Sequence, residues 1–131
     1  MTKEEKELLL QELCARLPYG VIVNVKGFDY DYNDKLTQIY KGDGCSIQVT
    51  TNMPYDIEQV KPYLFPLSSM TEEQEQDFDS LYTYDALIIE PQIKLINWCY
   101  KNHLDINGLI PKGLANDATG KNIYYDNRNK I

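Results

Sequence analysis

The first seventeen residues carry leucines and charged side chains at the spacing of an amphipathic helix. Thr2 and Glu5 have the spacing of a capping box, so the pattern predicts a helix over residues 2–17. One apolar face of that helix collects Leu9, Leu10, Leu13, Cys14 and Leu17. Glu12 and Arg16, at positions i and i+4, predict an ion pair on another face.

An alternating pattern follows and predicts three strands, over 19–28, 35–41 and 45–51. The apolar faces of the first and third strands consist of Val21, Val23, Val25, Cys45, Ile47 and Val49. The polar run 29–34 predicts a loop, and the Gly-Asp-Gly segment at 42–44 predicts a turn. Short connections between consecutive strands favour an antiparallel meander that packs on the first helix.

The second half of the chain predicts two more helices. Three prolines in 54–68 indicate an extended connection. A helix then begins at Ser69, where Glu72 completes a second capping box. Residues 86–89 fit either a short strand or the lead-in to a helix over 91–104. The broad apolar arc of that last helix predicts a central place in the core for Ile93, Ile96, Cys99, Tyr100, His103 and Leu104.

These elements predict an α+β fold. Its sheet is a meander of three or four antiparallel strands, packed by the first and third helices, and the acidic helix that begins at Ser69 is peripheral. Residues 1–115 form one domain. The polar tail 116–131 is either mobile or adds an edge strand around 123–125.

Composition narrows the function classes. The chain has 131 residues, a net charge of -7 and 43% hydrophobic residues, which is typical of one globular domain. It lacks the run of roughly 20 apolar residues that a membrane helix needs. The charged N-terminus is not a signal peptide, and the chain is not basic as a whole. Three scattered cysteines predict free thiols in a reducing cytoplasm.

The negative charge is concentrated in the middle of the chain. Residues 61–90 carry a net charge of -6, whereas residues 91–131 carry +3. The exposed start of the acidic helix therefore fits either a plain solvated face or an acidic contact surface, made by Glu72, Glu73, Glu75 and Asp77. Eleven tyrosines, against three phenylalanines and one tryptophan, fit either the rim of a thin core or a tyrosine-lined binding surface.

Three segments together resemble a known but uncharacterised family. They are LCARLPYGV at 13–21, VKPYLFPLSSMTEE at 60–73 and NWCYKNHLDINGLIPKGLA at 97–115. Short proteins with such segments are encoded in prophages, mobile elements and genomes of gut bacteria. The resemblance implies a phage-related context, and it implies no activity and no catalytic residues.

Candidate chemistry is sparse. Cys99 and His103 are spaced to share a helix face, where with Asp105 they form either an unrecognised active site or a buried structural group. The run that starts Asp29-x-Asp31 imitates a calcium loop but lacks its glycine and glutamate. We therefore predict no metal and no cofactor. In the loop 105–115, Leu109 and Lys112 form either a structural cover or a contact site.

We interpret the chain as a non-enzymatic binding protein that acts through a protein–protein surface, and a homodimer is plausible. One alternative is a small enzyme with its site near Cys99 and His103. The other is a nucleic-acid accessory protein, which is less favoured because of the net charge. That accessory would use the basic tail, namely Lys121, Arg128 and Lys130 with Tyr124 and Tyr125 as stacking groups.

Overall fold

The computed structural model describes residues 1–40, 47–50, 54–82 and 89–124. Within these residues the fold is α+β, with three α-helices and a six-stranded, mostly antiparallel sheet. The predicted fold class is therefore confirmed at this level. The predicted turn at 42–44, Cys45 and the segment 86–88 lie outside the described residues.

Helix α1 (Lys3–Arg16) starts at the predicted capping box. The Thr2 hydroxyl accepts a hydrogen bond from the Glu5 amide at 3.1 Å, and the Glu5 carboxylate accepts one from the Thr2 amide at 2.9 Å. The predicted buried face needs correction, because Cys14 is exposed. The buried residues of α1 are Leu9, Glu12, Leu13 and Arg16. The charged pair is buried because residues 104–107 cover it, which a helical projection alone does not reveal.

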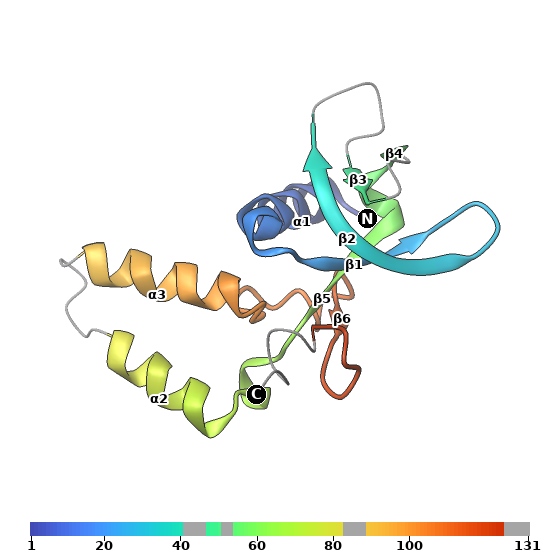
Figure 1. The fold of residues 1–131 in the computed structure, drawn as a ribbon. Helices are drawn as coiled ribbons and strands as arrows, with labels where there is room; N and C mark the ends of the chain where they lie inside the picture. The colour runs from blue at the N-terminus through green and yellow to red at the C-terminus, as the bar shows by residue number, and fades with distance from the viewer. Residues whose placement is uncertain (41–46, 51–53, 83–88, 125–131) are drawn as a thin grey trace.

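The six strands follow the order β4-β3-β2-β1-β5-β6 across the sheet (Figure 1). They are β1 (Ile22–Lys26), β2 (Asp31–Ile39), β3 (Ile47–Val49), β4 (Pro54–Tyr55), β5 (Val60–Leu64) and β6 (Asn116–Asp117). Neighbours are antiparallel except β5 and β6, which run parallel. The alternation predicted around β1 is confirmed, because Val21, Val23 and Val25 are buried in one core with Leu9 and Leu13.

Strand β2 begins earlier than predicted. Asp31 pairs with Lys26, and Asn33 pairs with Asn24, so residues 31–34 form strand and not the predicted loop. This end of the β1–β2 hairpin extends past the rest of the sheet (Figure 1). None of the residues 29–34 is fully buried, so the strand lacks the run of alternating core residues that marks β1.

The proline-rich segment 54–68 also contributes to the sheet. It is extended, as predicted, but it contains β4 and β5 and is not merely a connection. Strand β5 lies between β1 and β6, and the buried Pro62 stands opposite Val23. Proline lacks an amide hydrogen and is usually confined to edge strands, which is why the sequence pattern argued against a strand here.

Helices α2 (Glu72–Leu81) and α3 (Ile89–Lys101) lie side by side and project away from the sheet (Figure 1). The capping box of α2 is formed by Thr71 and Gln74, and not by the predicted Ser69 and Glu72. The Phe78 and Trp98 rings meet edge to face with centroids 6.2 Å apart, which joins the two helices.

Helix α3 ends at Lys101 and not at residue 104, because the chain reverses at His103. His103 has a left-handed backbone with φ 56°. The Leu104 amide donates to the Cys99 carbonyl, and the His103 amide donates to the Tyr100 carbonyl, both at 3.0 Å. This is the Schellman pattern of helix ends, with histidine at the position that glycine usually takes.

The apolar arc of α3 is buried only near its C-terminal end. Cys99 is buried, whereas Ile93 and Ile96 are exposed. Helix α3 therefore does not run through the centre of the core along its whole length. Among the described helices, none combines the length and the apolar content that crossing a bilayer requires.

The described part of the tail packs against the sheet. The Ala118 amide donates to the Leu64 carbonyl at 2.8 Å, and β6 pairs with β5 just before it. Ala118 and Tyr124 are both buried. The edge strand that we predicted around 123–125 thus lies at 116–117 instead, and residues 125–131 lie outside the described part of the chain.

Candidate functional site

A buried ion pair joins α1 to the segment that follows α3. Arg16 Nη2 lies 2.8 Å from Glu12 Oε2, and the two side chains are 0% and 2% exposed. The same nitrogen donates to the Leu104 carbonyl at 2.7 Å, and the Asn107 side-chain amide donates to Glu12 Oε1. The guanidinium carbon also lies 4.8 Å from the centre of the Tyr100 ring. Through these contacts the predicted ion pair links α1 to residues 104–107, which are distant in the sequence.

Two stacked rings, His103 and Tyr124, continue this buried polar cluster. Their centroids are 4.1 Å apart and their planes differ by 15°. The Tyr124 hydroxyl accepts a hydrogen bond from the Ile22 amide at 2.7 Å and donates to the Tyr63 carbonyl at 2.9 Å. Burial, and then the charge of Arg16, lower the pKa of His103 to about 3. The imidazole is therefore neutral at physiological pH.

The residues considered for an unrecognised active site are buried and separately engaged. Asp105 accepts hydrogen bonds from the amides of Leu109 at 2.7 Å and Ile110 at 2.9 Å, which shapes the loop that follows. Burial raises the pKa of the Cys99 thiol, which disfavours a thiolate. His103 lies beyond the C-cap of α3, so it does not continue the helix face of Cys99 as predicted.

The described residues contain no group of three or more His, Cys, Asp and Glu side chains that could hold a metal ion.

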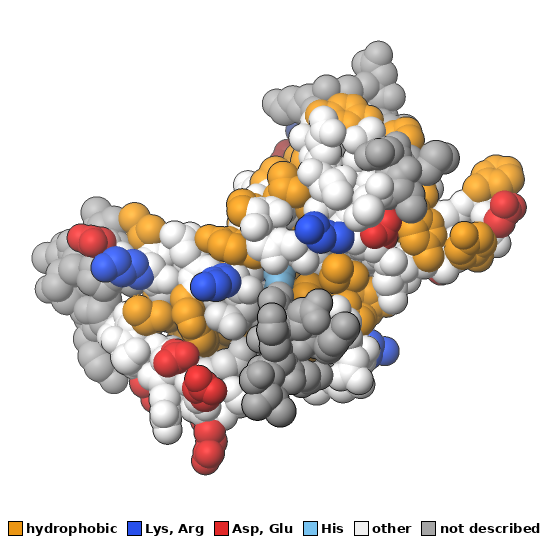
Figure 2. All heavy atoms as spheres, viewed as in Figure 1, with side chains coloured by type: hydrophobic (Ala, Val, Ile, Leu, Met, Phe, Trp, Pro, Cys, Tyr) orange, Lys and Arg blue, Asp and Glu red, His pale blue; other side chains and the backbone are white. Residues whose placement is uncertain are grey.

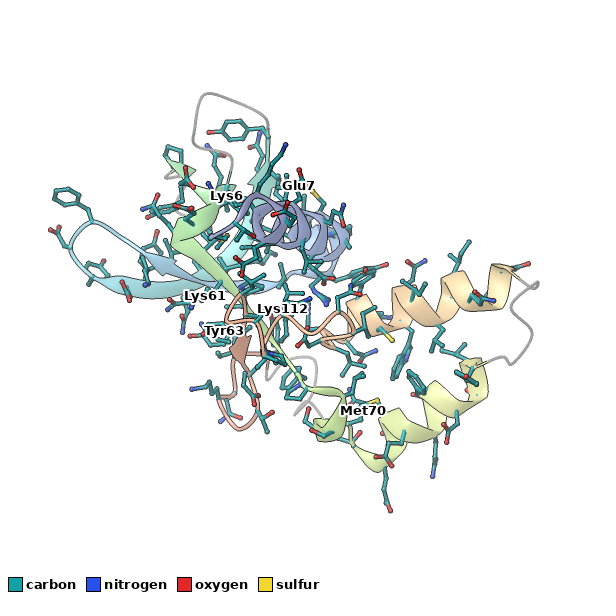
Figure 3. The ribbon with its side chains drawn as sticks, turned by 180° about the vertical axis from the view of Figure 1, so that it is seen from behind. Lys6, Glu7, Lys61, Tyr63, Met70 and Lys112 are labelled. Carbon is teal, nitrogen blue, oxygen red and sulfur yellow. The ribbon has the colours of Figure 1, made fainter. Side chains whose placement is uncertain are left out.

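The candidate binding residues of the loop 105–115 and of the C-terminal tail differ in how exposed they are. Leu109 is fully buried, whereas Lys112 is exposed and lies on the face shown in Figure 3. Lys121 is exposed, but the Tyr124 ring is buried and cannot stack on a nucleic-acid base. The remaining tail candidates, Tyr125, Arg128 and Lys130, lie outside the described residues.

The acidic residues of α2 are all on the surface. Glu72, Glu73, Glu75 and Asp77 are exposed, and Figure 2 shows carboxylates gathered on this helix. They lie at the opposite end of the molecule from the β1–β2 hairpin (Figure 1).

Among the described residues, the most exposed aromatic side chains lie at the outer end of the β1–β2 hairpin, residues 25–32, which we call the arm. Phe28 is fully exposed, and Tyr30 is 72% exposed. Asp29 and Asp31 alternate with them and are exposed as well. Figure 2 shows this end of the hairpin standing clear of the body with apolar and acidic side chains on it. The arm thus presents aromatic and acidic groups together.

The turn of the arm has a specific backbone requirement. A Cβ atom on Gly27 would lie 2.6 Å from the Tyr30 carbonyl oxygen, which is closer than real Cβ contacts. Glycine therefore permits the tight return of the chain after Lys26. The turn sets Phe28 at the tip, beyond the last paired residues Lys26 and Asp31.

A row of tyrosines connects the arm to the core. The Tyr30 and Tyr32 ring centroids are 5.9 Å apart, and those of Tyr32 and Tyr55 are 6.3 Å apart. The Tyr32 and Tyr55 hydroxyls share a hydrogen bond, which with burial raises the pKa of Tyr55 to about 12. Because Tyr55 is buried, the row anchors one face of the arm.

No protein-family model, curated protein or solved structure matches this chain. The case for a functional site therefore rests on the residues themselves.

Sequence reasoning missed the arm. It assigned residues 29–34, DYDYND, to a solvated loop because of their acids, and it placed Phe28 at the end of the preceding strand. The available signal was the strict alternation of aromatic and acidic residues, which is the period of a strand.

We expect Tyr124→Phe to lower the free energy of unfolding by about 1–3 kcal/mol, because the Ile22 amide and the Tyr63 carbonyl each lose a buried partner. Urea unfolding measures this loss. Tyr30→Phe is the matched control, and since its hydroxyl belongs to an exposed side chain we expect a change within about 0.5 kcal/mol. Equal effects of the two substitutions would contradict the role given to Tyr124.

Proposed function

We propose that this chain is a non-enzymatic binding protein of the prophage or mobile-element type, and that it binds a protein partner through the arm. The full exposure of the Phe28 ring carries this proposal. An apolar ring at the tip of a hairpin gains nothing from folding, whereas it gains free energy when a partner covers it. Aromatic residues of this kind dominate the binding energy of many interfaces.

The charges of the arm indicate the chemistry of the partner. Asp29 and Asp31 flank the exposed rings, and the whole chain carries a net charge of -7. Complementary potentials steer association and exclude wrong partners. We therefore propose that the arm enters an apolar pocket whose rim carries lysine or arginine.

The arm is already held in one conformation before it binds, so binding is expected to cost little conformational entropy. The β1–β2 ladder pairs residues up to Lys26 and Asp31, and the tyrosine row ties Tyr32 to the buried Tyr55. A preorganised hairpin loses less conformational entropy on binding than a flexible loop does. The buried states of Cys99 and His103 support a structural role for these residues and not catalysis.

Site-specific photo-cross-linking tests the proposal. A benzophenone amino acid at position 28 is expected to form one adduct with a host protein, while the same group at the exposed Thr37 of β2 forms none. With that partner purified, we expect Tyr30→Ser to raise the dissociation constant by about 10- to 100-fold. Reversing the charges with Asp29→Lys and Asp31→Lys is expected to slow association, most strongly at low salt.

Two results would count against the arm. One is an equal adduct from positions 28 and 37. The other is a partner whose affinity ignores the arm variants but falls when the α2 acids Glu72, Glu73 and Glu75 are changed to glutamine. Circular dichroism of each variant checks that the fold is retained.

A further inference from the structure

The loop after α3 contains an asparagine followed directly by a glycine, at Asn107 and Gly108. No other asparagine in the chain precedes a glycine. Asparagine deamidates most readily before glycine, because glycine has no Cβ atom to hinder the attack of its backbone nitrogen on the asparagine side chain. The pair lies between the end of α3 and β6, in the part of the loop that contacts α1 (Figure 1).

The backbone at this pair is open. Asn107 is exposed, and a Cβ atom on Gly108 would meet nothing within 4 Å. The next two amides, of Leu109 and Ile110, both donate to the Asp105 carboxylate. Within the described residues, by contrast, neither Asn107 nor Gly108 donates a backbone hydrogen bond. The Gly108 nitrogen therefore keeps its proton outside the hydrogen-bond network of the loop, and no helix or strand restrains the peptide between the two residues.

The Asn107 side chain contacts the buried ion pair. Its amide nitrogen donates to Glu12 Oε1, while Glu12 Oε2 lies 2.8 Å from Arg16 Nη2. This amide nitrogen is the atom that leaves in deamidation. The reactive dipeptide thus supplies the hydrogen-bond donor to a carboxylate that is only 2% exposed.

We propose that Asn107 is a site of spontaneous deamidation, and that its conversion weakens the link between α1 and the loop. The Gly108 nitrogen bonds to the Asn107 Cγ atom, the Cγ–Nδ2 bond breaks, and ammonia leaves with the proton of the Gly108 amide. One water molecule then opens the resulting succinimide ring at either of its carbonyls. The products are aspartate and isoaspartate, and in isoaspartate the main chain runs through the former side chain.

Both products change the contact with Glu12. A carboxylate has no hydrogen to donate, so Glu12 Oε1 loses its partner where the surrounding chain admits little water. The new charge arrives on the Oε1 side of Glu12, whereas Arg16 binds the Oε2 side. A negative charge added beside a carboxylate destabilises through repulsion and desolvation. Isoaspartate also lengthens the main chain of the turn that Asp105 holds.

Peptide mapping of aged native protein tests the site, and it does so whether or not the arm binds a partner. After incubation at mildly alkaline pH, we expect the peptide around Asn107 to exchange an NH2 group for OH, as its mass shows. Asn33 and Asn97 are internal controls, because both are exposed but lie within β2 and α3. We expect these two to stay intact. Asn107→Gln, whose side chain would have to close a larger ring, is the resistant variant.

A native protein in which Asn107 stays intact overturns the proposal. A sample unfolded in urea, where Asn107 is expected to convert, shows that the conditions suffice for the reaction. Equal conversion of Asn33 and Asn97 in the native protein also counts against it, because the loop would then confer no selectivity.

The effect on the fold has a separate readout. Asn107→Asp represents the aspartate product in pure form, and we expect its urea midpoint to lie about 0.5–1.5 M below that of the wild type. Asn97→Asp makes the same charge change at an exposed position of α3 and is expected to leave the midpoint nearly unchanged. Equal midpoints of these two variants would overturn the weakening of the α1 link.

Discussion

The Arg16→Ala variant is expected to unfold with a free energy about 3–5 kcal/mol lower than that of the wild-type protein. Arg16 and Glu12 are both almost fully buried, and the substitution leaves the Glu12 carboxylate buried without its cation. It also removes the donor that the Leu104 carbonyl accepts from at 2.7 Å. Urea unfolding followed by circular dichroism measures the loss.

Two further variants separate the ion pair from simple truncation. Removing both charges with Glu12→Leu and Arg16→Met is expected to recover stability to within about 1–3 kcal/mol of wild type. The buried Leu104 carbonyl then lacks its donor, whereas the exposed Asn107 side chain, which loses Glu12, can bond to water. Lys6→Ala breaks the exposed pair with Glu58, 3.1 Å long, and is expected to cost less than about 1 kcal/mol. A double variant less stable than Arg16→Ala would contradict this account.

Acid is expected to destabilise the fold through His103. Its pKa falls from 6.5 to about 3 on folding, so the unfolded chain takes up a proton that the native imidazole refuses. The stability that depends on a neutral ring is complete above pH 6.5 and is lost as the pH falls toward 3. For one proton this amounts to about 3 kcal/mol between pH 6.5 and pH 4.

The measurement is the pH slope of the unfolding free energy, compared with that of His103→Asn. Asparagine also tolerates the left-handed backbone found at this position, with φ 56°, but does not titrate. Carboxylates with a lowered pKa, such as Glu5, contribute equally to both slopes. Parallel slopes in the two proteins would show that His103 is protonated as easily in the native state as in the unfolded one.

The buried cluster and the arm have different relations to the sequence. The cluster unites α1 with residues 103–107 and with Tyr124, three segments that are far apart in the chain. The sequence predicted the Glu12–Arg16 pair, on a face other than the apolar one, but it did not predict that the pair is buried. Local periodicity contains no information on which distant segment covers a helix. The arm was missed for a different reason, since residues 31–35 of β2 include no fully buried side chain to impose a hydrophobic pattern.

Other errors have equally local causes. Both Ser69 and Thr71 have the sequence spacing of a capping box before α2. Thr71 is the N-cap, because Ser69 belongs to the short helical turn Leu67–Ser69 that precedes the helix. Helix α3 ends earlier than predicted because His103 adopts the left-handed backbone conformation. Glycine usually occupies this position at a helix end, so nothing in the sequence indicated it. Neither the cap nor the turn changes the hydrophobic periodicity on which the prediction relied.

By itself the sequence determined the α+β class, the span and cap of α1, the inward valines around β1 and the acidic surface of α2. These features depend on interactions within one element, whose period and capping chemistry are written in adjacent residues. Only the tertiary structure decided that Arg16 is buried, that β5 joins the sheet and that Phe28 stands at an exposed tip. Burial, strand neighbours and exposure depend on contacts between residues up to 102 positions apart, and local periodicity does not encode such contacts.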